Sequence, residues 1–164
     1  MIKMKAKIVA IEYCLGENKE TNAVLKLDNP EWRLEDIEKK TGIIQRWISS
    51  ESSTAVDLAC KACEKIFKNL DREKIDTLIF VTQSPDYFLP TSACIIQDRL
   101  SLKSSTKCFD INQGCSGFVY GYARLPCLVN HKTQVIVQHV YQHAGKHRSL
   151  MGQPWEIHRA LQVV

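Results

Sequence analysis

The chain has 164 residues, of which 45% are hydrophobic and 24% are charged. This length suits one domain of ordinary size with a buried core. No apolar run approaches the roughly 18 to 20 residues that a membrane-spanning helix requires, and the start of the chain has no signal-peptide cleavage site. The seven cysteines are odd in number and irregularly spaced, which indicates reduced thiols. The sequence therefore predicts a cytoplasmic protein with no membrane span.

The formal net charge of +4 is concentrated near the end of the sequence. Residues 1–122 carry 17 basic and 17 acidic side chains, whereas residues 123–164 carry five basic side chains and only one acid, Glu156. All five histidines lie in this tail: His131, His139, His143, His147 and His158. Because the tail lacks a dense Lys/Arg stripe and any recognisable nucleic-acid-binding module, we expect no nucleic-acid partner.

The first part of the chain alternates between strand-like and helix-like patterns. Residues 7–13 form a short β-rich run. Asn29 is suited to cap a helix that Gly42 ends, which places Trp32 at the start of a mostly polar helix. A second helix is predicted after the capping-box pair Thr54 and Asp57. Its buried stripe consists of Ala55, Leu58, Ala59, Ala62, Cys63, Ile66 and Phe67.

The middle of the chain predicts a buried strand followed by a helix. Residues 77–82 are too uniformly apolar for a half-exposed strand, so they predict a central strand covered on both faces. A loop follows over residues 83–90, and Thr91 with Ser92 can cap a helix that reaches about Leu100. The alternation indicates an α/β layered domain with a mixed or parallel sheet.

A cysteine of chemical interest follows the next predicted strand. Residues 107–111 predict this strand, and residues 112–118 turn tightly into an apolar helix. Near the helix start, free backbone N–H groups and the helix dipole would favour the thiolate of Cys115. The flanking Gly114 and Gly117 would allow backbone or substrate to approach closely. From spacing alone, Cys115 is either a nucleophile or a buried structural cysteine.

The other cysteines carry weaker signals. Cys60 and Cys63 form a CxxC pattern inside an amphipathic helix, without a second pair of ligands. This context favours core packing over zinc or redox chemistry. Cys94 and Cys108 are also interpreted as core positions.

Four stretches of the chain occur in the order typical of one enzyme family. They are Glu31-Trp32, Lys40-Thr41-Gly42-Ile43, LPTSACIIQ at residues 89–97 and FDINQGCSGF at residues 109–118. These stretches resemble the amino-terminal portion of β-ketoacyl-acyl-carrier-protein synthase III, over about residues 5–122. Chalcone synthases and hydroxymethylglutaryl-CoA synthases share the nucleophilic cysteine but fit the first two stretches less well. The resemblance implies a thiolase-like layered α/β/α fold, first half only, with a mixed sheet and helices on both faces.

The resemblance also implies an acyltransferase that initiates fatty-acid biosynthesis. An acyl-CoA acylates the cysteine, and malonyl-acyl carrier protein then decarboxylates and attacks the thioester. A thiolate suits both steps because it is a nucleophile and a good leaving group. The implied partners are acyl-CoA, acyl carrier protein and a second copy of the chain in a homodimer. No cofactor and no metal are expected.

The resemblance implies roles for individual residues. Cys115 matches the nucleophile, and its backbone N–H would form half of the oxyanion hole. Trp32 matches the tryptophan that stacks on the adenine of CoA, with core packing as the alternative. Leu89 matches an apolar residue that reaches the partner subunit's acyl pocket. Lys40 and Ile44 replace arginines of the family, and because lysine lacks a planar guanidinium, we expect weaker binding of CoA.

The last part of the sequence departs from the family. The His and Asn that polarise the malonyl carbonyl belong to a second half that does not occur here, so we expect an inactive or partly active chain. Pro126 is expected to interrupt the helix after Cys115. We predict a condensing-enzyme segment at residues 1–122 and an atypical basic, His-rich tail at residues 123–164 that is disordered, translated out of frame, or a divergent terminus.

Two other functions remain open from the sequence. In the first, the chain is a nonenzymatic remnant that is able to pair with an intact condensing subunit. In the second, its tail binds a metal. His139, His143 and His147 would line one face of a helix and suit zinc or nickel. Residues 133–141 instead favour a strand, in which His139 and His143 are too far apart for easy joint ligation.

Overall fold

The computed structural model describes residues 8–83, 85–114, 116–128, 134–141 and 159–163. The strands of its larger sheet lie in the order β1-β7-β6-β4-β5, and β2 and β3 form a separate antiparallel pair. Within these residues, no helix has the length and apolar character needed to cross a membrane. The elements are β1 (Ile11–Glu12), β2 (Asn18–Thr21), α1 (Asn22–Asp28), α2 (Leu34–Thr41), β3 (Gln45–Ile48), α3 (Ala55–Ile66), η1 (Arg72–Lys74), β4 (Ile75–Val81), α4 (Ser92–Arg99), β5 (Lys107–Ile111), α5 (Gly117–Leu128), β6 (Gln134–Tyr141) and β7 (Arg159–Val163).

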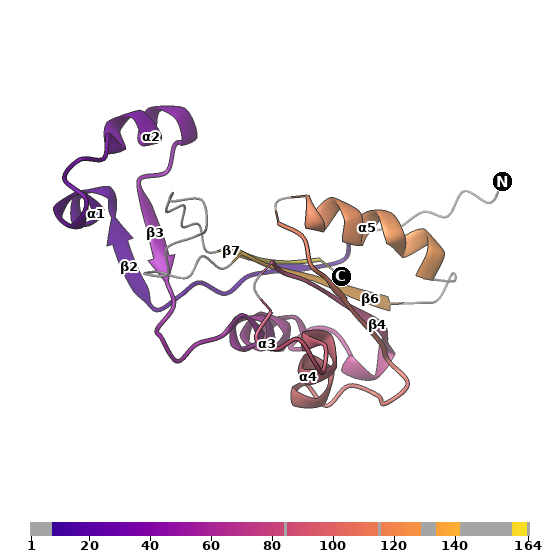
Figure 1. The fold of residues 1–164 in the computed structure, drawn as a ribbon. Helices are drawn as coiled ribbons and strands as arrows, with labels where there is room; N and C mark the ends of the chain where they lie inside the picture. Colours follow the sequence, from indigo (N-terminus) through magenta and orange to yellow (C-terminus); the bar gives the residue numbers. More distant parts are fainter. Residues whose placement is uncertain (1–7, 84, 115, 129–133, 142–158, 164) are drawn as a thin grey trace.

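Strand β4 is central and covered on both faces, as its sequence predicts. It pairs in parallel with β5 on one side and with β6 on the other. Leu78 and Phe80 belong to a buried cluster with residues of α3 and α4, whereas Ile79 and Val81 pack with Phe118 of α5. Figure 1 shows α3 and α4 on one side of the sheet and α5 on the other. The predicted layered α/β fold with a mixed sheet is confirmed, because β7 pairs antiparallel with its neighbours.

Helix α3 begins and packs as predicted. The Thr54 hydroxyl accepts a hydrogen bond from the Asp57 N–H at 3.2 Å, and the Asp57 carboxylate accepts one from the Thr54 N–H at 2.8 Å. Burial acts to raise the pKa of Asp57, but hydrogen bonds from Thr54 and from Arg99 of α4 outweigh it and lower the pKa. The predicted apolar stripe is buried, except for the half-buried Phe67. The capping box therefore fixes the start of the helix that covers one face of β4.

The prediction for the helix around Trp32 was wrong at its start and right at its end. Asn29 ends α1 instead of beginning α2, since both its backbone N–H and its side-chain amide donate to the Leu25 carbonyl at 3.1 Å. Helix α2 begins only at Leu34 and ends at Gly42, which adopts a left-handed conformation with φ of 71°. Trp32 consequently lies in the connection between α1 and α2.

Residues beyond 122 contribute strands to the large sheet. Strand β6 confirms the strand predicted over residues 133–141, and β7 pairs with both β6 and β1. Strand β1 covers only Ile11–Glu12, so it is shorter than the predicted run. The expectation that Pro126 interrupts the helix was wrong, because α5 continues across Pro126 and ends at Leu128, within one turn of the proline. The division of the chain after residue 122 stays a prediction.

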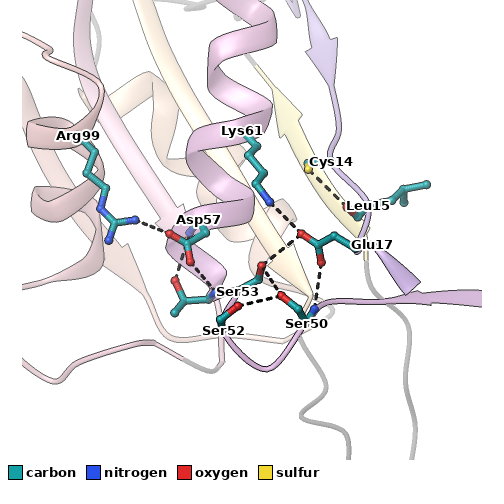
Figure 2. A network of polar contacts seen from close by, with 10 residues as sticks. Cys14, Leu15, Glu17, Ser50, Ser52, Ser53, Asp57, Lys61 and Arg99 are labelled. Carbon is teal, nitrogen blue, oxygen red and sulfur yellow. Dashed lines mark hydrogen bonds and ion pairs between the residues drawn. The ribbon is translucent and has the colours of Figure 1, made fainter. Parts of the chain in front are cut away.

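A polar network joins the segment before β2 to α3 (Figure 2). The Glu17 carboxylate accepts from Lys61 Nζ at 2.9 Å, from the Ser50 N–H at 3.0 Å and from the Ser53 hydroxyl at 3.2 Å. The bond from Lys61 is the largest cause that lowers the pKa of Glu17 to about 2. Because this ion pair is exposed and screened by solvent, it positions the segment more than it stabilises the fold.

Helix α4 is capped from β5, a contact that local sequence does not predict. Thr91 precedes the helix as predicted, but its side chain makes no capping hydrogen bond. The Asp110 carboxylate instead accepts from the N–H groups of Ser92 at 2.7 Å and Ala93 at 2.8 Å. These N–H groups would otherwise lack a partner within the helix. Asp110 therefore fixes the end of the loop between β4 and α4 against β5.

We expect Asp110→Ala to lower the free energy of unfolding by about 1 to 2 kcal/mol, the usual cost of removing a helix cap. Urea denaturation measures this change. Asp98→Ala, at an exposed position of the same helix, is the matched control and should change stability by less than about 0.5 kcal/mol. Equal losses in the two variants would contradict the capping role of Asp110.

Candidate active site

Two predicted site residues belong to loops that follow the carboxyl ends of two neighbouring strands. Strands β4 and β5 are parallel neighbours, and the Thr82 N–H donates to the Ile111 carbonyl at 3.1 Å just beyond their ends. The loop after β4 carries Leu89, and the turn after β5 carries position 115. Ligand sites of parallel α/β sheets commonly lie beyond the carboxyl ends of the strands. The region beyond the carboxyl ends of β4 and β5 is therefore the candidate active site.

The turn between β5 and α5 is compact in the residues that flank Cys115. The Gly117 N–H donates to the Gly114 carbonyl at 2.9 Å, and the Ser116 hydroxyl donates to Gln113 Oε1 at 3.1 Å. Helix α5 begins at Gly117, so the predicted strand, turn and helix are present in this order. Cys115 itself lies outside the described residues, and its role as nucleophile stays a prediction.

The two glycines of this turn allow it to pack directly on β4. A Cβ atom at position 117 would collide with Val81 Cγ1, and one at position 114 would lie 2.7 Å from Gln83 Oε1. A side chain at position 117 would push the turn away from Val81, whereas one at position 114 would require only the end of the Gln83 side chain to move. The close backbone approach predicted for Gly117 is thus made toward β4, and that predicted for Gly114 is made toward the side chain of Gln83, two residues beyond β4.

Leu89 lies in an exposed apolar segment. Leu89 is 83% exposed, its neighbour Phe88 is 97% exposed, and Tyr87 is exposed as well. Consecutive large apolar side chains on a surface are typical of an interaction site. The exposure fits a residue that reaches a partner subunit, although that contact stays a prediction.

Trp32 and Lys40 lie in the small unit formed by α1, α2, β2 and β3, which projects from the layered sheet in Figure 1. Trp32 is half-buried, and its carbonyl accepts a hydrogen bond from Lys26 Nζ. Lys40 is exposed in the last turn of α2. The structure therefore brings the loops of Leu89 and Cys115 to the carboxyl ends of β4 and β5, and it places Trp32 and Lys40 in a separate unit. The binding roles of the latter two stay predictions.

Arg46 holds the projecting unit together, and the sequence analysis missed it. Its guanidinium donates to Glu20 Oε2 and to Asn22 Oδ1, each at 2.8 Å, and the residue is only 7% exposed. Asn22 also donates to the Ile43 carbonyl at 2.8 Å, just beyond Gly42. Arg46 and Glu20 are direct cross-strand partners. The interaction of Arg46 with Glu20 can be predicted only once the pairing of β2 with β3 is known.

The described thiols differ in burial and acidity. Cys63 is buried, which confirms its predicted core position, and burial raises the pKa of Cys60 to about 11 and that of Cys108 to about 12. The prediction for Cys94 was wrong, because Cys94 is exposed while Ala93 and Ile96 occupy the core face of α4. Cys108 is only half-buried.

A metal site is not found in the part of the chain that the structure describes, where no group of three His, Cys, Asp or Glu side chains could hold an ion. His139 lies in strand β6, as the strand interpretation of residues 133–141 predicts. His143 and His147 lie outside the described residues, so the metal-binding alternative for the tail is not tested by these positions.

Known proteins with related sequences are named as 3-oxoacyl- or beta-ketoacyl-[acyl-carrier-protein] synthases. The chain is 36% identical over 124 residues to a putative 3-oxoacyl-[acyl-carrier-protein] synthase 3 of Campylobacter jejuni, which covers 71% of this chain and 35% of that protein. It is 41% identical over 108 residues to a beta-ketoacyl-[acyl-carrier-protein] synthase III of Clostridium perfringens, with coverage of 65% and 31%. The chain thus spans about a third of the length of these relatives. No protein-family model matches the chain.

Solved structures agree with these relatives. The 3-oxoacyl-[acyl-carrier-protein] synthase III of Aquifex aeolicus matches with a TM-score of 0.76 and 28% identity, over 96% of this chain and 52% of that one. Another 3-oxoacyl-(acyl-carrier-protein) synthase III matches with a TM-score of 0.78 and 33% identity, over 95% and 48%. The resemblance predicted from the sequence is therefore confirmed: over the matched residues, the chain is similar in sequence and in its layered α/β fold to β-ketoacyl-acyl-carrier-protein synthase III proteins.

Proposed function

We propose that the chain accepts an acyl group from acyl-CoA on Cys115, the first step of a β-ketoacyl-acyl-carrier-protein synthase III reaction. The observation that carries the proposal is the tight turn from β5 into α5 at the shared edge of β4 and β5. The Cys115 thiolate attacks the thioester carbonyl, and CoA leaves as its thiol. The start of α5 supplies backbone N–H groups and a positive dipole end that favour the thiolate.

The proposed substrates are acyl-CoA and malonyl-acyl carrier protein, with no cofactor and no metal. Trp32 stacks on the adenine of CoA and Lys40 lies beside it, as the resemblance implies. Leu89 contributes to the acyl pocket of a partner subunit, which its high exposure supports. We place the reaction in the cytoplasm, because the cysteines among the described residues are free thiols.

The second step of the reaction, decarboxylative condensation, is expected to be inefficient in this chain. It requires hydrogen-bond donors aimed at the malonyl thioester carbonyl, where negative charge develops as carbon dioxide leaves. The family's His and Asn for this purpose have no match among residues 1–122. We therefore propose that the 164-residue chain retains acyl transfer and lacks efficient condensation.

A homodimer is the proposed assembly. Strand β5 is an edge strand of the sheet that the described residues form, and it exposes Phe109, while the loop after β4 exposes Phe88. An edge strand with exposed apolar side chains favours pairing with another chain. A second copy that pairs along β5 would cover both residues.

We expect the chain to sediment as a dimer or larger species at micromolar concentration. Phe88→Asp should shift the population toward monomer, because it places a charge in the covered surface. Leu27→Asp is the matched control, since Leu27 is 81% exposed on α1, away from the β5 edge. A wild-type chain that sediments only as a monomer would contradict the proposed assembly.

Cys115 should be the thiol that reacts fastest with iodoacetamide, because it combines the electrostatics of a helix start with a position in an accessible turn. Cys60 and Cys108 should react slowly, since burial raises the pKa of each. Peptide mapping after limited alkylation of the folded protein measures the order. Faster labelling of Cys94, which is exposed, or of Cys60 or Cys63 would favour a structural role for Cys115.

Incubation with acetyl-CoA should add one acetyl group to the chain, detected by intact-protein mass. Cys115→Ala should abolish this adduct, and Cys94→Ala should keep it. With malonyl-acyl carrier protein added, acetoacetyl product should form at least about 100- to 1,000-fold more slowly than in a complete enzyme, the usual cost of losing one such donor.

Robust Cys115-dependent acetoacetyl product would show that condensation is retained and would overturn that part of the proposal. A dimeric chain that is never acetylated would instead favour the nonenzymatic alternative, in which the chain acts only as a dimer partner.

A further inference from the structure

We propose that Arg46 is a positioning residue for the nucleotide of acyl-CoA. It acts through Asn22, which joins the backbone segments that carry Trp32 and Lys40. The inference rests on the proposed function in one respect, namely that these two residues bind the adenine end of CoA. Arg46 itself contacts no substrate and takes no part in the transfer of the acyl group.

Arg46 is a buried charge that two acceptors hold in place. One guanidinium nitrogen donates to Glu20 Oε2 and the other donates to Asn22 Oδ1, each at 2.8 Å. Glu20 neutralises the charge from the neighbouring strand, where it is the direct cross-strand partner of Arg46. The planar guanidinium reaches both acceptors at once, whereas the ammonium group of a lysine is a single point charge. The side-chain amide of Asn22 is therefore held in one orientation.

The amide nitrogen of Asn22 points to the end of α2. Because the amide oxygen accepts from Arg46, the Nδ2 group is left to donate to the Ile43 carbonyl, at 2.8 Å. The Asn22 backbone N–H donates to the Ile44 carbonyl at 3.2 Å. These two bonds hold the chain that follows α2 against the start of α1. Lys40, in the last turn of α2, is positioned by this contact.

Helix α1 connects Asn22 to Trp32. Asn22 is the first residue of α1, and Lys26 lies about one turn further along the same helix. Lys26 Nζ donates to the Trp32 carbonyl, and the Trp32 N–H donates at 3.1 Å to the carbonyl of Asn29, which ends the helix. Trp32 is thus tied to α1 through both of its backbone polar groups. A shift of Asn22 would change the position of Trp32 relative to Lys40.

Acetyl transfer from two thioesters tests the proposal, because acetyl-pantetheine lacks the nucleotide that acetyl-CoA carries. Asn22→Ala removes the relay but leaves Arg46 paired with Glu20, and Arg46→Lys keeps the charge but loses the planar fork. Each variant should raise the half-saturating concentration of acetyl-CoA by about 3- to 10-fold, the usual contribution of one aromatic stacking contact, at an unchanged maximal rate. Acetylation by acetyl-pantetheine should keep the wild-type rate, which also shows that the variants are folded.

Lys19→Gln is the matched control. It removes one exposed cation from β2, and Lys19 pairs in register with Trp47 instead of Arg46. This variant should use both thioesters as the wild-type chain does. Binding of CoA is measured in parallel by isothermal titration calorimetry, which requires no acyl transfer.

Equal losses with the two thioesters, or unchanged saturation by acetyl-CoA in either variant, would overturn the positioning role and leave the proposed acyl transfer intact. A wild-type chain that binds CoA but is never acetylated would overturn the proposed function alone. Calorimetry then decides the positioning role, since weaker CoA binding in both variants supports it and unchanged binding overturns it. A wild-type chain that neither binds CoA nor is acetylated overturns both proposals.

Discussion

The burial of β4 on both faces is the constraint on which the other elements depend. Leu78 and Phe80 face α3 and α4, Ile79 and Val81 face α5, and all four are at most 1% exposed. Full burial of one such side chain contributes roughly 1.5 to 3 kcal/mol. Parallel pairing with β5 and β6 then brings the carboxyl ends of three strands to one edge. The turn of Cys115 and the loop of Leu89 follow from this alignment.

Local patterns were sufficient for the layered core. The capping box of Thr54 and the apolar stripe of α3 predict a helix correctly, because both signals lie within a few consecutive residues. Asn29 shows the limit of such signals, since one residue type suits the end of one helix and the start of the next. The Asp110 cap and the Arg46–Glu20 pair join residues that are distant in sequence, so local patterns could not predict them.

The candidate site was predicted through the resemblance to a family more than through physical pattern. Spacing alone left Cys115 open between a nucleophile and a core cysteine, and four separate stretches in family order favoured the nucleophile. The exposure of Cys94 was missed because α4 buries only a narrow face, with Ala93 and Ile96 inward.

Amide hydrogen exchange tests the central role of β4 most directly. Because β4 is paired on both edges and covered on both faces, its amides should open only with global unfolding and should exchange more slowly than others. The amides of β2 and β3, in the projecting unit, should exchange by local opening at higher rates. Slow exchange confined to β4 and its neighbours β5 and β6 is the predicted result. Exchange in β4 as fast as that in β2 and β3 would contradict the account.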